Sequence, residues 1–239
     1  MSLLTIVQET LREIGGFEVP TSVVGNTNET AVLSLALVNR SLLETAKRTR
    51  WPNQTVRGTI TTSDGTDQYV LPSDFKALIN DSMWDDTNNR KVYGPIGPTE
   101  WEYLKNSDIT ESSLVTYMRI FKASSASNNR VFYLYPTPDG VATIRYEYMS
   151  NALAESSGGT AQAKFLADTD TGLLSEDTVA LGFKWRILKS RGLPYAEEFR
   201  DYEAAVEDSV NDTGAPIINL GGPNQTSRFV FVTPEGSWE

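Results

Sequence analysis

Apolar side chains recur with helical spacing through the N-terminal part of the chain. Their spacing predicts an amphipathic helix over residues 3–14, which ends at the glycine pair 15–16. A second helix is expected to begin after Asn28, a suitable N-cap, and to stop before Trp51, because the residue before a proline disfavours helical geometry. Apolar residues surround most of this second helix, which predicts that it is the central helix of a bundle.

A further pair of helices is predicted within residues 175–210. Ser175 fits the N-cap position of the first helix, and the acidic residues after it suit the positive end of the helix dipole. Gly192 can end this helix in a left-handed conformation, and Pro194 can open the next one. Apolar side chains between residues 179 and 188 cover a wide arc, so this helix is expected to contact more than one partner.

The pattern changes to that of β-structure between the two helical segments. Residues 55–61 and 67–71 flank turn-forming residues and predict a hairpin. Alternation of apolar and polar residues over 143–148 indicates a sheet with one solvated face. The other elements expected here are a strand within 77–85, a short helix over 98–104, and strands over 114–121, 131–135 and 141–149, the last two joined by the tight connection 136–140.

This order of elements predicts an α+β fold with two lobes and an arm. Residues 1–52 and 174–212 would form a helical bundle, and residues 53–173 would form an inserted antiparallel β-sheet lobe. Residues 213–239 lose all periodicity and predict an extended C-terminal arm.

The arm contains apolar residues that a solvated tail seldom carries. We expect these residues to anchor the arm on a partner, for example by adding a strand to another subunit. The alternative is an arm that folds back on its own domain. The candidate anchors are Ile217, Ile218, Leu220, Phe229, Val230, Phe231, Val232 and Trp238.

Composition narrows the possible chemistry. Hydrophobic residues make up 39% and charged residues 22% of the 239 residues, as in a globular protein. The chain has no Cys and no His, which excludes disulfides, Cys and His catalysis, and most zinc, copper and haem ligation. The net charge of −10 disfavours a nucleic-acid-binding surface. No apolar run approaches a membrane span and no signal peptide is evident, so a soluble, unprocessed protein is expected.

Sequence motifs for ligand binding are weak. Asp168 and Asp170 alternate as calcium ligands do, but Leu173 and Val179 stand where an EF-hand needs glycine and a carboxylate, so a loop leading into a helix cap is expected. Neither type of glycine-rich phosphate loop is present. We therefore predict no catalytic residue, no metal site and no cofactor.

Two other functions remain open from the residues alone. Aromatic side chains in the strands over 117–148 could form a face that stacks on sugars or bases, although core packing and subunit contacts explain them more simply. Carboxylate pairs suitable for glycoside cleavage are possible, but none stands out among the 31 acidic residues.

The chain resembles the head-to-tail adaptors of tailed bacteriophages, a family also described as head completion or tail tubular protein A-like portal adaptors. The resemblance rests on the order of four features and spans most of residues 1–212. These features are the N-terminal helix pair ending at Trp51-Pro52, the segment 69–75, the segment 133–140 before the strand 144–148, and the helical pair with Trp185-Arg186 and residues 192–199.

This resemblance implies a structural virion protein of the phage neck, made in the host cytoplasm, and not an enzyme. Its subunits would form a ring, typically a dodecamer, that binds the portal and continues the DNA channel toward the downstream tail or nozzle protein. Genomic DNA would pass through an acidic lumen without sequence-specific binding, and no membrane would be involved. A glycan-binding or cell-wall-hydrolysing tail component is the alternative. The residues expected at the subunit interface are Phe183, Trp185, Ile187 and Leu188.

Overall fold

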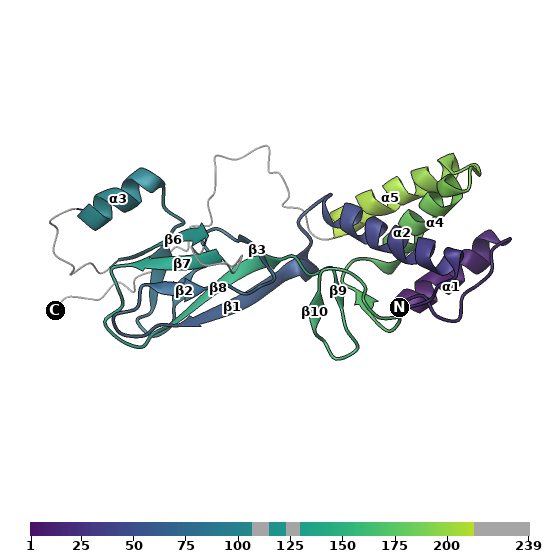
Figure 1. Ribbon diagram of the computed structural model, residues 1–239. Helices are drawn as coiled ribbons and strands as arrows, with labels where there is room; N and C mark the ends of the chain where they lie inside the picture. Colours follow the sequence, from purple (N-terminus) through teal and green to yellow (C-terminus); the bar gives the residue numbers. More distant parts are fainter. Residues whose placement is uncertain (107–114, 123–129, 213–239) are drawn as a thin grey trace, which may run out of the picture.

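The computed structural model describes residues 1–106, 115–122 and 130–212 of the chain. These residues form an elongated molecule with helices at one end and a curled sheet at the other (Figure 1). The arrangement confirms the predicted α+β class. Leu114 at the start of one predicted strand, and the whole predicted arm, lie outside the described residues.

The helical end consists of α1 (Leu3–Ile14), α2 (Glu29–Ala46), α4 (Glu176–Ser190) and α5 (Ala196–Asp212). Helix α4 packs against α1, α2 and α5. The prediction that α2 is the central helix is therefore wrong. Helix α2 leaves Val32 and Leu43 on the surface, whereas α4 buries side chains toward all three neighbours.

Capping residues place the helix boundaries close to their predicted positions. The Asn28 side chain accepts a hydrogen bond from the backbone N of Thr30 at 2.8 Å. Ser175 occupies the N-cap position of α4, but its side chain makes no capping hydrogen bond, contrary to prediction. Gly192, with φ of 70°, ends the α4 region, and the N of Leu193 bonds back to the O of Leu188 at 3.0 Å.

The described strands of the other end form an eight-stranded sheet. Its order is β1-β8-β4-β5-β6-β7-β2, with β3 also beside β8. Strands β1 and β2, at the two ends of this order, are joined by residues 62–67, so the sheet curls toward a barrel (Figure 1). The strands are β1 (Thr55–Thr61), β2 (Gln68–Val70), β3 (Phe75–Leu78), β4 (Trp84–Asp85), β5 (Arg90–Tyr93), β6 (Thr116–Lys122), β7 (Arg130–Tyr135) and β8 (Thr143–Ser150).

The predicted hairpin of β1 and β2 does not form. Strand β1 pairs with β8, and β2 pairs with β7. The turn residues instead bond to the connection between β7 and β8: the N of Thr62 donates to the O of Ala142 at 2.8 Å, and the N of Gly65 donates to the O of Pro138 at 2.9 Å. These distant partners separate the two strands.

The sheet is mixed, which corrects the predicted antiparallel sheet. Strands β5 and β6 pair in parallel, while the other strand pairs of the described sheet are antiparallel. Parallel neighbours need a long connection, and here it includes helix α3 (Pro98–Asn106), which falls where a short helix was predicted. The alternation predicted for β8 is confirmed, because Ile144, Tyr146 and Tyr148 are buried and Arg145 is exposed.

A small sheet lies between the two ends. It consists of β9 (Ala154–Glu155), β10 (Ala161–Gln162) and β11 (Thr171–Gly172), and the 3-10 turn η1 (Pro52–Gln54) leads from the helices into β1. The Asp168 carboxylate accepts hydrogen bonds from the N atoms of Val23 and Val24, and the O of Asp170 accepts one from the N of Leu3. The two aspartates thus fasten loops around α1.

Two separate hydrophobic cores support the two ends. The helical core includes Leu3, Leu42, Phe165, Phe183 and Ile187, and the sheet core includes Phe75, Met118, Phe132, Leu134 and Tyr146. Leu153, Ala154, Phe165 and Leu174 belong to the helical core, although they lie near or within the C-terminal part of the region predicted as the β-lobe. The sheet end therefore extends from about residue 55 to residue 150.

Candidate interaction surfaces

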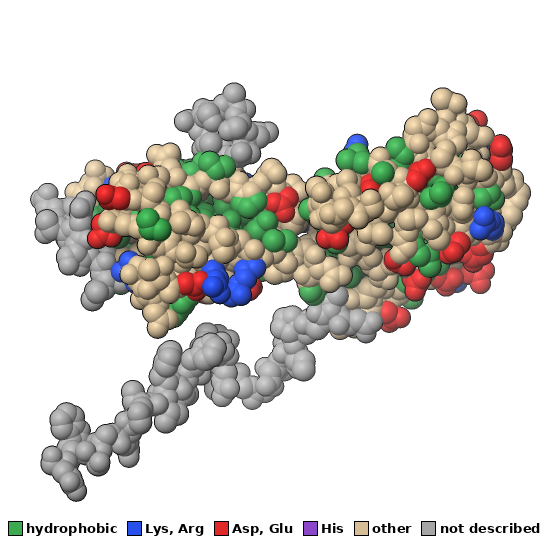
Figure 2. Space-filling model, turned by 90° about the horizontal axis from the view of Figure 1, so that it is seen from below, with side chains coloured by type: hydrophobic (Ala, Val, Ile, Leu, Met, Phe, Trp, Pro, Cys, Tyr) green, Lys and Arg blue, Asp and Glu red, His purple; other side chains and the backbone are tan. Residues whose placement is uncertain are grey.

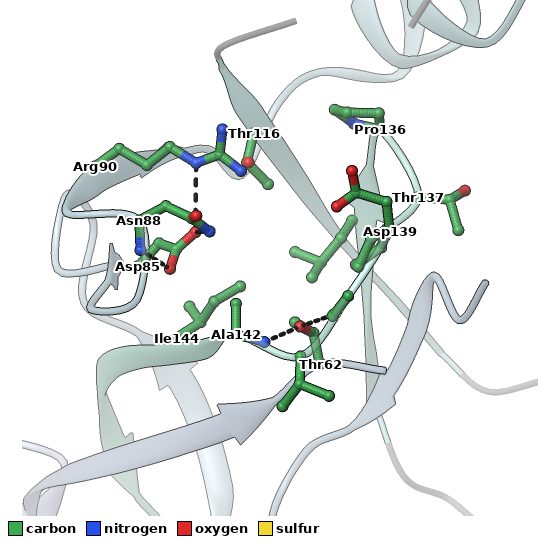
Figure 3. A pocket seen from close by; sticks show the side chains of 14 residues that line it. Thr62, Asp85, Asn88, Arg90, Thr116, Pro136, Thr137, Asp139, Ala142 and Ile144 are labelled. Atoms are coloured by element: carbon green, nitrogen blue, oxygen red, sulfur yellow. Dashed lines mark hydrogen bonds and ion pairs between the residues drawn. The ribbon is translucent and has the colours of Figure 1, made fainter. Parts of the chain in front are cut away.

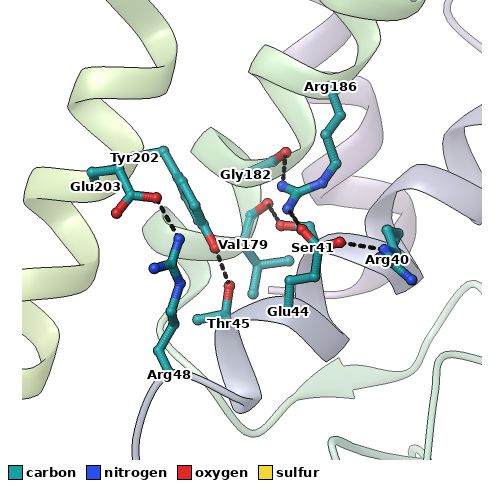
Figure 4. Close-up of polar contacts among 10 residues, drawn as sticks. All are labelled: Arg40, Ser41, Glu44, Thr45, Arg48, Val179, Gly182, Arg186, Tyr202 and Glu203. Carbon is teal, nitrogen blue, oxygen red and sulfur yellow. Dashed lines mark hydrogen bonds and ion pairs between the residues drawn. The ribbon is translucent and has the colours of Figure 1, made fainter.

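A polar network joins α2 and α4 inside the helical end (Figure 4). Arg186 is buried, with 6% of its surface exposed, and its Nη1 donates to the O of Gly182 at 2.5 Å. Its Nη2 pairs with the Glu44 carboxylate, which also pairs with Arg40. Because a buried guanidinium is costly without a partner, Glu44 is required to hold Arg186 in place.

The environment of Glu44 lowers the pKa of its carboxyl. Partial burial alone would raise that pKa, but the hydrogen bonds and positive charges of Arg186 and Arg40 outweigh burial. Glu44 is therefore ionised at neutral pH and neutralises Arg186.

Close helix packing extends this network to α5. The hydroxyls of Thr45 and Tyr202 are 3.1 Å apart, and Ser41 donates to the O of Val179 at 3.1 Å (Figure 4). A Cβ atom on Gly182 would lie 2.0 Å from the Ser41 Oγ, so only glycine allows this approach. The α4–α5 pair is consequently held rigidly against α2.

An aromatic corner lies at the turn between α4 and α5, formed by Trp185, Leu193, Tyr195 and Phe199. The rings of Trp185 and Phe199 meet edge to face at 5.2 Å, and the ring of Tyr195 lies 6.2 Å from Trp185. Leu193, Tyr195 and Phe199 are 43%, 36% and 38% exposed. Partly exposed aromatic residues on a rigid support are typical of protein–protein contacts.

The four residues predicted at the subunit interface differ in how much of each side chain is exposed. Phe183, Ile187 and Leu188 are buried within the chain itself, so their side chains are not on its surface. Trp185 alone of the four is partly exposed and belongs to the aromatic corner. Three of these residues are buried because the wide apolar arc of α4 packs against α1, α2 and α5.

Leu193, Tyr195 and Phe199 were not identified as site residues from the sequence. Their signal was present, because apolar and aromatic residues follow the Gly192 turn at the start of an otherwise acidic helix. The predicted arm anchors Ile217, Ile218, Leu220, Phe229, Val230, Phe231, Val232 and Trp238 lie outside the described residues.

A groove of about 490 Å³ runs between α1, α4 and α5. Ile6, Ala180 and Leu181 contribute apolar surface, and Glu9 and Asp177 contribute acidic side chains. Acidic side chains also gather on the helical end in the view from below (Figure 2). This end of the molecule presents negative charge rather than a basic surface.

Helix α3 covers the aromatic face of the sheet. Trp101 is 4% exposed and meets Phe121, Tyr133 and Tyr135 edge to face at 6.1, 6.3 and 6.4 Å. The Nζ of Lys105 lies 5.5 Å from the Trp101 ring. These rings pack against one another instead of forming an open stacking face for sugars or bases.

A polar cavity of about 450 Å³ opens at the far end of the sheet (Figure 3). Its most buried carboxylate, Asp85, is 2% exposed. That carboxylate accepts hydrogen bonds from the N of Thr87 at 3.1 Å, the N of Asn88 at 3.0 Å and the Nε of Arg90 at 3.3 Å. Asp85 thus organises its own turn, and Asp139 lines the cavity from another loop (Figure 3).

A carboxylate–tyrosine cluster lies within the sheet core. Asp74 accepts hydrogen bonds from the Tyr148 hydroxyl at 3.1 Å and from the Ser150 hydroxyl at 2.7 Å. Burial, with the nearby charge of Asp74, raises the pKa of Tyr146 and of Tyr148 to about 12. Both phenols remain protonated at neutral pH, so Tyr148 acts as a structural donor.

The described residues contain neither a metal-binding cluster nor a membrane-spanning helix. In residues 1–106, 115–122 and 130–212, no group of three His, Cys, Asp or Glu side chains is arranged to hold a metal ion. None of the helices in these ranges combines the length and apolar character that crossing a membrane requires.

An α+β chain with an exposed aromatic corner, an acidic helical end and a curled sheet fits a structural protein that contacts other proteins. The comparison with protein families agrees with this class. The model of the SU10 adaptor protein family matches residues 1–213, and the chain belongs to this family of phage head-to-tail adaptors. A search of curated proteins found no match.

Proposed function

We propose that this chain is a head-to-tail adaptor that binds the portal and assembles into a dodecameric ring in the virion neck after synthesis in the host cytoplasm. The match of the adaptor family over residues 1–213 is the observation that carries this proposal. The ring continues the DNA channel from the portal toward the tail, as in the adaptors that the chain resembles.

The helical end forms the body of the ring in this proposal. Closing a ring requires two different faces of one subunit to meet. The aromatic corner supplies one face, with Trp185 contacting the neighbour and Phe183, Ile187 and Leu188 supporting it from the core beneath.

The acidic residues of α5 face the lumen in this proposal. Glu197, Asp201, Glu207 and Asp208 are exposed, and Arg200 is the single basic residue of the helix. A negative wall repels DNA phosphates and keeps the genome from adhering, without any sequence-specific contact.

The other two parts of the chain contact other proteins of the virion. The sheet end faces the downstream tail or nozzle protein, and the arm from residue 213 anchors on the portal or on a neighbouring subunit through its apolar residues. The four-residue run Phe229–Val232 and the residues Ile217, Ile218, Leu220 and Trp238 are the proposed anchors.

Particle mass tests the proposal directly. The purified chain mixed with its portal is expected to give a complex whose mass corresponds to portal plus twelve adaptor subunits. A chain lacking residues 213–239 should keep its helical circular dichroism and lose portal attachment. Full portal binding by the truncated chain would contradict the anchoring role of the arm. Failure of the intact chain to bind the portal would contradict the proposed portal binding itself.

A further inference from the structure

The sheet end contains a slot between β3 and β6 where a strand is missing from an otherwise continuous order. Strand β8 is paired along one side by β4 at Ile144 and Arg145, and then by β3 from Tyr148 to Ser150. Strand β6 is paired by β5 only at Thr116 and Tyr117. Beyond these residues, no described strand pairs with both β3 and β6.

On the β6 edge of this slot, backbone groups beyond Met118 have no strand partner among the described residues. After β5, the N of Ile96 donates to the O of Met118 at 3.1 Å, and beyond Met118 no strand of the described residues pairs with that side of β6. Strand β3 pairs only with β8 within the described chain, and on its other edge the O of Lys76 already accepts a hydrogen bond from the Arg130 side chain at 2.7 Å, so an added strand would displace that side chain to pair there. Exposed strand edges of this kind readily accept an added strand.

The slot has the size and lining of a peptide site. Its volume is about 700 Å³, within the range of binding clefts. Apolar side chains line it, and the guanidinium of Arg130 lies 5.8 Å from the Phe75 ring. The lining includes Phe75, Ala77, Leu78, Pro95, Ile120 and Arg130.

We propose that residues Phe229–Val232 of a neighbouring copy occupy this slot as an added strand. All four residues favour β-structure, and their number matches the four residues of β3. Pro234 follows shortly after, and because proline lacks an N–H it would end the ladder there. The inference rests on the proposed ring, since it names the surface through which one subunit holds the next.

The charges near Phe229–Val232 and the length of the arm favour this run, from a neighbouring copy, as the occupant of the slot. Arg228 precedes the run and Glu235 and Glu239 follow it, so its flanks carry a net negative charge, and the slot carries the exposed cations Lys76 and Arg130. Phe229 lies 17 positions after Asp212, so the intervening chain can span about 55 Å when extended. Ile217 lies only five positions after Asp212 and can reach about 17 Å, so its run has a much shorter range than Phe229–Val232.

Cysteine cross-linking tests this contact cleanly because the chain has no cysteine of its own. One chain carries Ala77→Cys in the slot, and a second chain of different tag length carries Val230→Cys in the arm. The two are mixed, assembled with the portal, mildly oxidised and run on a non-reducing gel. We expect at least tenfold more mixed dimer than from a control pair in which Thr59→Cys, an exposed position on β1, replaces Ala77→Cys.

A chain carrying both cysteines distinguishes a neighbour from the same subunit. Intrachain cross-linking without dimer would overturn the inference, because the arm would then fold back on its own slot. Rings of the correct mass with no dimer above the control would also overturn it, while leaving the proposed function intact. If no ring forms, the proposed function fails, and the same assay on the free chains decides the arm contact: mixed dimer supports it and its absence overturns it.

Discussion

Arg186 and Glu44 carry the most consequential single charges of the helical end. Arg186 is almost fully buried between α2, α4 and α5, and Glu44 is the carboxylate that balances it. From the sequence, Arg186 was named within the Trp185-Arg186 feature of the family resemblance. Its burial depends on the approach of α2, which helical periodicity does not reveal.

Replacing Glu44 by Gln is expected to destabilise the protein by about 2 kcal/mol at pH 7, because Arg186 loses its charged partner. The pKa of Glu44 is lowered in the folded state, so its stabilising contribution is complete above the ordinary value of 4.5 and is lost as the pH falls through the lowered pKa. Glu44→Gln should therefore give a flatter dependence of stability on pH below 4.5. Urea unfolding across pH measures both effects.

Glu13→Gln provides the matched control for this change. Glu13 pairs with Lys184, but the Glu13 side chain is 63% exposed. Its loss should change the free energy of unfolding by less than about 1 kcal/mol. Equal losses from the two variants would contradict the role assigned to the buried pair.

At the scale of elements, helix α3 shows how a short helix can close a sheet face. Its position was predicted from its sequence, but its role was not. From the sequence, the aromatic residues of β6 and β7 could have formed a face that stacks on sugars or bases. The structure shows that Trp101 covers them.

Trp101→Ala is expected to lower the free energy of unfolding by about 3 kcal/mol, because it removes a buried ring and leaves a cavity beside three aromatic neighbours. Tyr103→Ala on the same helix, at a side chain 64% exposed, should stay within about 0.5 kcal/mol of the parent. Chemical denaturation compares the two. A loss for Tyr103→Ala as large as for Trp101→Ala would show that α3 acts through helix formation rather than through the Trp101 contact.

At the scale of the whole molecule, the two hydrophobic cores predict two units of stability. Phe132→Ala removes a fully buried ring of the sheet core and should accelerate amide hydrogen exchange in β6, β7 and β8, with little change in α2 and α4. Phe183→Ala, in the helical core, should give the reverse pattern. Exchange measured by mass spectrometry locates both effects. Acceleration of both ends by either variant would mean that the molecule unfolds as one unit.

Local sequence signals are enough to predict the helices, most of the strands and the adaptor family. Helix α1 ends at Gly15 and α2 begins at its Asn28 cap, as predicted, because these signals act between residues close in the chain; α2 ends at Ala46, before the predicted stop at Trp51-Pro52. Family resemblance likewise needed only the order of local segments, and the family match over residues 1–213 confirmed it.

Tertiary structure alone decided strand pairing and which apolar residues reach the surface. Strand β1 pairs with β8, about 90 positions away, instead of with the adjacent β2. The residues of a strand do not specify which other strand it pairs with, because every strand edge offers the same backbone donors and acceptors. The same holds for α4: Phe183 and Ile187 face the core while the neighbouring Trp185 joins the exposed corner, since three other helices determine which sides of α4 remain uncovered.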